Sequence, residues 1–98
     1  GDVYKRQELE RVLPDGAQVT RPDGGMFLWA RLGHGIDTTR LLEMAVEEGV
    51  AFVPGASFYA HDPDTSTMRL SFVTHAPDVI REGVERLASA IERYQREN

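Results

Sequence analysis

The chain has 98 residues, 41% hydrophobic and 28% charged, which fits one globular domain with a packed core. The formal net charge of -5 offers no basic surface for a phosphate backbone, and the lack of cysteine excludes disulfides and thiolate chemistry. No apolar run approaches the roughly 20 residues that cross a bilayer, so we expect a cytoplasmic protein that binds neither nucleic acid nor membrane.

The first 16 residues indicate the end of a helix. Leu9, Val12 and Leu13 follow the i, i+3, i+4 spacing of an apolar helical stripe, and the Pro-Asp-Gly sequence at 14–16 then stops it. The letters DVYKRQ resemble a translated adapter. We therefore predict that residues 1–7 are a non-native leader and that the native helix end covers residues 8–16.

Residues 17–20 predict a short strand, and a turn at 21–25, rich in glycine, leads into a second strand over 26–32. In that second strand Met26, Leu28 and Ala30 alternate with Phe27 and Trp29. Because apolar side chains occupy both sets of positions, we expect cover on both faces of this strand.

A helix is predicted from Asp37, its N-cap, to about residue 48, with Gly49 as a left-handed C-cap. A short apolar strand over 50–53 follows and is broken by Pro54. A long loop over 56–66 then precedes the last strand.

That last strand, over 67–73, has a period of two. Met68, Leu70 and Phe72 share one face, whereas Arg69 and Val73 share the other. The lone charge is therefore expected on the face opposite the core.

Pro77 is predicted to open the final helix, which runs to about residue 94. Its apolar positions form one stripe: Ile80, Val84, Leu87, Ile91 and Tyr94.

These elements predict an α+β fold, a two-layer sandwich in which a small, mostly antiparallel sheet of about four strands carries two helices on one face. Phe27, Trp29 and Val73 leave apolar groups on the other face. A small monomer rarely exposes a sizeable apolar patch. Two interpretations stay open: a partner covers this face, or the N-terminal segment or the long loop folds over it.

Four segments, RPDGGMFLWARL, DTTRLLEMAVEEGVAFVPGASFYA, MRLSF and APDVIREGVERLASAI, follow one another as in a known family. Over residues 8–95 the chain resembles the C-terminal small domain of class I/II, fold type I aminotransferases, nearest the 2-aminoadipate, kynurenine and aromatic aminotransferase branch. The resemblance implies that residues 8–16 end an interdomain helix and that residues 17–98 form the small domain. The implied reaction transfers an amino group from an amino acid to a 2-oxo acid with pyridoxal 5'-phosphate.

The resemblance also implies two substrate-binding residues. Arg69, in the RLSF segment, matches the arginine that pairs with the substrate α-carboxylate, and Phe27, in the GMF segment, matches an aromatic that lines the side-chain pocket. The alternatives are a solvated Arg69 paired with an acidic neighbour and a Phe27 that packs in the core. Tyr59 is a weaker candidate for the pocket rim.

We assign no catalytic, cofactor-binding or metal-binding residue to this chain. Lys5 is its only lysine and precedes the resemblance, whereas the resemblance places the cofactor's lysine in a preceding large domain. His34, His61 and His75 lack metal-ligand spacing. The fragment is therefore expected to be inactive alone and to belong to a parent that forms a homodimer.

Two other functions stay open from the residues. The parent could be a transcription regulator whose effector domain has the aminotransferase fold. The chain could also be a non-catalytic interaction module that pairs through its apolar sheet face.

Overall fold

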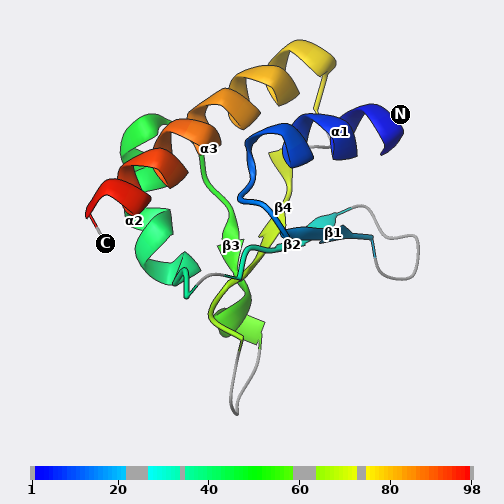
Figure 1. Cartoon of the computed structure of the whole chain (residues 1–98). Helices are drawn as coiled ribbons and strands as arrows, with labels where there is room; N and C mark the ends of the chain where they lie inside the picture. The colour runs from blue at the N-terminus through cyan, green and yellow to red at the C-terminus, as the bar shows by residue number, and fades with distance from the viewer. Residues whose placement is uncertain (1, 22–26, 34, 59–63, 73–74, 98) are drawn as a thin grey trace.

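A computed structural model describes residues 2–21, 27–33, 35–58, 64–72 and 75–97. These residues form two layers, a four-stranded sheet and a layer of α-helices on one of its faces (Figure 1). The predicted α+β sandwich is confirmed. The helix layer contains three helices and not two, because α1 (Asp2–Val12) packs against α3 (Pro77–Glu97), which also contacts α2 (Thr38–Glu48).

The sheet has the strand order β1-β2-β4-β3, and all neighbours are antiparallel. Its strands are β1 (Gln18–Thr20), β2 (Leu28–Arg31), β3 (Val53–Pro54) and β4 (Thr67–Leu70). Both central strands are shorter than the 26–32 and 67–73 predicted. Within the described residues, the pairing of β2 with β4 ends at Arg31 and at Leu70.

Strand β3 begins three residues later than the predicted 50–53. The Val50 N–H donates to the Ala45 carbonyl at 2.9 Å, so residue 50 still closes the end of α2 and is not free to pair with a strand. Pro54 then lies at the sheet edge, where a missing N–H is tolerated.

Local sequence explains where α2 begins and ends. The Asp37 carboxylate accepts from the backbone N–H groups of Thr39 at 2.9 Å and Arg40 at 3.4 Å, which makes it the predicted N-cap. Gly49 adopts φ 93°, the left-handed conformation of a C-cap that glycine enters without steric cost. Both caps are confirmed.

The core lies between the sheet and the helices. On the sheet side, Leu28, Ala30, Met68 and Leu70 are at most 2% exposed. The helix α3 contributes the predicted stripe, and it continues to Glu97, three residues beyond the expected end. The stripe is buried in full: Ile80, Val84, Leu87, Ile91 and Tyr94.

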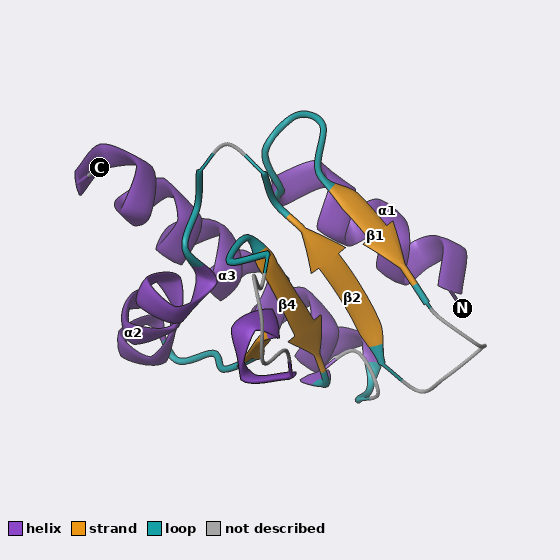
Figure 2. Ribbon diagram, turned by 90° about the horizontal axis from the view of Figure 1, so that it is seen from below, coloured by secondary structure: helices purple, strands orange, loops and turns teal. Residues whose placement is uncertain are grey.

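The sheet face opposite the helices, called the open face below, carries the alternate residues of β2 and β4. The sequence left open whether the N-terminal segment or the long loop folds over this face. The N-terminal segment does not, because Leu9 of α1 is fully buried in the core on the helix side. The 3-10 turn η2 (Gly55–Phe58), in the predicted long loop, does lie against β4 on this face (Figures 1 and 2).

Within the described residues, no helix is both long and apolar enough to span a membrane.

Candidate functional site

Arg69 lies near the middle of the open face. Strand β4 pairs it with Trp29 of β2 on one side and with Val53 of β3 on the other. Its chain neighbours Met68 and Leu70 are fully buried on the helix side, so the Arg69 side chain, half-buried, points away from the helices. Figure 2 shows this face of β2 and β4 with the helices behind it. The predicted orientation of the lone charge is confirmed.

Three aromatic side chains, Phe27, Trp29 and Phe58, form a cluster around this arginine. The Arg69 Cζ atom lies 4.2 Å from the centre of the Phe27 ring and 5.1 Å from the centre of the Phe58 ring. The Trp29 and Phe58 rings meet edge to face, with centroids 5.2 Å apart and an interplanar angle of 63°. A guanidinium at these distances is attracted by the electron-rich ring faces.

The guanidinium of Arg69 has no acidic partner among the described residues. Its Nε atom is buried and has no hydrogen-bond acceptor there. Arg31, two residues along the same face of β2 from Trp29, differs in this respect, because its Nε is 2.8 Å from a carboxylate oxygen of Asp64. The interpretation of Arg69 as a strand residue paired with an acidic neighbour therefore finds no support in the described residues.

Phe27 is half-buried and lies outside the core cluster, with its ring against Arg69. It therefore has the position of a wall beside the guanidinium and not that of a core residue. Tyr59, the weaker candidate for the pocket rim, lies outside the described residues, as do the predicted strand residues Met26 and Val73. Phe58 was not predicted to contact Arg69, because eleven positions of sequence separate the two and no short motif joins them.

Lys5 and the open face lie apart in the structure. Lys5 lies in α1, on the far side of the sheet from Arg69 (Figure 1). No group of three or more His, Cys, Asp or Glu side chains in the described chain could hold a metal ion, and His75 is exposed near the start of α3. A covalent cofactor on Lys5 would be separated from Arg69 by the whole sheet.

The Asp64 carboxylate lies beside Arg31 and Ser66 at the edge of the open face. It accepts from the Ser66 hydroxyl at 2.6 Å and the Ser66 N–H at 2.9 Å. These hydrogen bonds first, and the charge of Arg31 second, lower the pKa of Asp64 below its ordinary value. Through its ion pair with Arg31, Asp64 connects the end of the 56–66 loop to β2.

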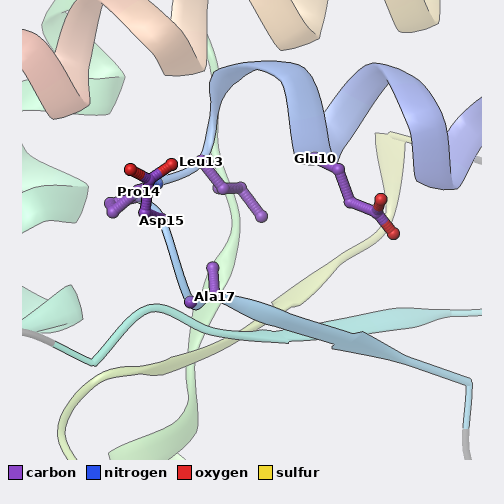
Figure 3. Close-up of a pocket in the computed structure, with 6 residues that line it drawn as sticks. Glu10, Leu13, Pro14, Asp15 and Ala17 are labelled. Carbon is purple, nitrogen blue, oxygen red and sulfur yellow. The ribbon is translucent and has the colours of Figure 1, made fainter.

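Two surface cavities that are lined by described residues lie away from Arg69. One, of about 220 Å³, lies where α1 ends and β1 begins, and Figure 3 shows Leu13 and Ala17 pointing into it. The other, of about 260 Å³, lies between the end of α2 and the first turns of α3 and is lined by Val50, Phe72 and Val79 among others. Neither cavity is lined by a residue of the aromatic cluster around Arg69.

Solved structures with this architecture assign the class of protein. The chain matches an α-aminoadipate aminotransferase from Thermus thermophilus, complexed with N-(5'-phosphopyridoxyl)-L-leucine, with a TM-score of 0.82 and 39% identity over 96% of the chain and 24% of that structure. It matches a kynurenine aminotransferase from Pyrococcus horikoshii with a TM-score of 0.78 and 46% identity, over 92% of the chain and 22% of that structure. The fold is thus that of an aminotransferase domain.

Sequence comparison then assigns the family. The model of aminotransferase class I and II matches residues 3–87, and the chain belongs to this family. It is 53% identical over 83 residues to aromatic-amino-acid aminotransferase 1 of Thermococcus litoralis, covering 85% of the chain and 20% of that relative. It is 45% identical to the 2-aminoadipate transaminase of Thermus thermophilus, covering 85% of the chain and 21% of the relative.

The predicted family and branch are therefore confirmed. The chain spans only about a fifth to a quarter of the length of these relatives. The aligned part is the part that holds the open face.

Proposed function

We propose that this chain is the substrate-carboxylate-binding part of a pyridoxal phosphate-dependent aminotransferase that transfers an amino group from an amino acid to a 2-oxo acid. One observation carries the proposal. A half-buried guanidinium stands on a rigid central strand, between aromatic rings, without an acidic partner among the described residues.

The chemistry of Arg69 suits an α-carboxylate. A guanidinium is planar, remains charged at neutral pH and presents parallel N–H donors that match the two oxygens of a carboxylate. Since Nε is shielded, the two terminal nitrogens are the groups that an incoming carboxylate would contact. Held at this end, the amino acid would have a fixed orientation, which lowers the entropic cost of reaction.

Phe27 would form a wall of the same site. Its ring lies against the guanidinium, so a substrate bound by its carboxylate would pass close to it. This position supports a role in contacting the substrate side chain.

The cofactor would be held by the parent's large domain, outside the residues that carry the open face. Pyridoxal phosphate supplies the electron sink for amino-group transfer when it is bound. The chain itself would contribute recognition and a pocket wall, and it would be inactive alone. The homodimeric parent is proposed on the family resemblance. The cytoplasmic location stays a prediction from the sequence.

The test replaces Arg69 in the full-length protein that carries this segment. Arg69→Ala should lower kcat/KM and the amino-acid half-reaction rate at least 100-fold, because each lost hydrogen bond to a charged group is worth about 1.5–3 kcal/mol. Single-turnover absorbance measurements would follow the half-reaction with an amino-acid substrate.

Arg69→Lys is the matched variant, since it keeps the charge and loses the planar pair of donors. It should retain part of the activity. In both variants the absorbance of the lysine-bound cofactor should remain, since that lysine lies elsewhere. Unchanged substrate kinetics in Arg69→Ala would refute the proposed role.

A further inference from the structure

Phe58 is an exposed aromatic residue whose ring contacts both the Arg69 guanidinium and the Trp29 ring. Its side chain is 45% exposed although it is large and apolar. Its ring nevertheless lies 5.1 Å from the Arg69 Cζ atom and meets the Trp29 ring edge to face at 5.2 Å. An aromatic ring that only filled the core would be buried, and this one is not.

Among the described residues, no hydrogen bond orients the Arg69 guanidinium through its Nε atom. Its side chain has several rotatable bonds, and its Nε finds no acceptor among the described residues. The Phe27 and Phe58 rings are the contacts that do engage the guanidinium. Cation–π attraction has a preferred geometry over each ring, so two rings constrain where the group sits better than one.

We propose that Phe58 is a positioning residue, which holds the Arg69 guanidinium in place for the substrate carboxylate. Trp29 holds Phe58 in turn through the edge-to-face contact, because Trp29 is fixed in β2 by its register with Arg69 and Thr20. This inference rests on the proposed function. It assigns no contact of Phe58 with the substrate.

The backbone of η2 places Phe58 at this point. A Cβ atom on Gly55, the first residue of η2, would overlap the Oγ1 atom of Thr67 and lie 2.9 Å from its Cβ. Only glycine therefore allows the turn to approach β4 this closely. Thr67 is two residues before Arg69 on the same face of the strand, so the turn brings Phe58 over the arginine.

A competing explanation is that Phe58 simply covers apolar surface on the open face. The two explanations differ in what the ring must be. To cover apolar surface, residue 58 needs only an apolar side chain of similar size. To hold the Arg69 guanidinium, it needs the face of an aromatic ring. Leucine at position 58 keeps the first property and loses the second, and tyrosine keeps both.

The experiment uses the full-length enzyme and a double-mutant cycle between Phe58 and Arg69. Phe58→Leu should lower kcat/KM for the amino acid by about 3- to 30-fold, the range of a partly desolvated cation–π contact, mainly through a higher KM. Phe58→Tyr should restore kcat/KM to within about twofold of the wild type. Phe58→Met serves as a second non-aromatic variant in case Phe58→Leu folds poorly.

The decisive measurement is Phe58→Leu in the Arg69→Ala background. If Phe58 acts through Arg69, the second substitution should change kcat/KM by less than about twofold. Val46→Ala, which trims an apolar side chain that is 59% exposed on α2, controls for general loss of surface packing and should leave kcat/KM unchanged.

The failures of the two proposals are distinguishable. If Arg69→Ala leaves the kinetics intact, the proposed function fails. If Arg69→Ala is severe but Phe58→Leu resembles the wild type, or lowers activity equally in both backgrounds, the carboxylate role stands and the positioning role of Phe58 is wrong.

Discussion

The two faces of strands β2 and β4 differ in the burial and the polarity of their side chains. On the helix side, β2 and β4 present Leu28, Ala30, Met68 and Leu70, each at most 2% exposed. On the open face they present a half-buried arginine and tryptophan. Because side chains alternate along a strand, eight residues divide into a set that stabilises the fold and a set that is available for binding.

The open face carries a group that does little for the stability of this domain. A buried N–H without an acceptor costs about 1–3 kcal/mol, and cation–π contacts contribute about 0.5–2 kcal/mol, so the two effects at Arg69 nearly offset each other. A half-buried guanidinium that neither packs in the core nor forms an ion pair with a described neighbour is available to bind a ligand.

The largest expected effect separates the two faces directly. Leu70→Ala should lower the free energy of unfolding of the chain by about 2–5 kcal/mol, because it opens a cavity in the core. Arg69→Met, the adjacent residue on the other face, should change it by less than about 1 kcal/mol. Urea denaturation followed by circular dichroism measures both. Equal losses would show that the open face is as structural as the core.

Alternation made this division predictable from the sequence. The apolar positions of β2, β4 and α3 follow periods of 2 and 3.6, and the caps of α2 follow from Asp37 and Gly49. Strand ends were less predictable. A helix cap can use residues that the strand pattern also claims: the Val50 N–H closes the end of α2, so the strand begins later than its apolar residues suggest.

The candidate site was predictable only in part. Arg69 and Phe27 stand in short segments that resemble a family, so sequence alone could name them. The contact of Phe58 with Arg69 depends on how closely η2 approaches β4 and therefore on the space left by Gly55. No local pattern encodes that distance, because it is set by packing between segments remote in the chain.

A smaller effect on the free energy of unfolding is expected on the helix side of the sheet, at the Asp37 N-cap of α2. Asp37→Ala should lower the free energy of unfolding by about 1 kcal/mol, since two backbone N–H groups at the start of α2 lose their acceptor. Asp37→Asn is the control and should nearly match the wild type, because asparagine caps as well as aspartate. An Asn variant as unstable as the Ala variant would mean that charge, and not the cap, accounts for the effect.

The smallest effect concerns the polar edge of the open face. Hydrogen bonds from Ser66, aided by the Arg31 charge, lower the pKa of Asp64 in the folded chain, so the unfolded chain binds more protons as pH falls. The stabilisation from Asp64 is thus present above the unfolded pKa of about 3.9 and lost as pH falls through the lower folded value. It should be at most about 1 kcal/mol, because the side chains of Arg31 and Asp64 are 58% and 43% exposed.

Urea titrations between about pH 6 and pH 2.5 would measure this loss. Ser66→Ala should flatten the acid-side decline more than Arg31→Met, because the hydroxyl is the leading cause of the shift and the charge is a lesser one. The reverse order would show that the ion pair dominates. The open face would then be held at its edge by charge, which added salt would weaken, whereas the helix side would keep its stability.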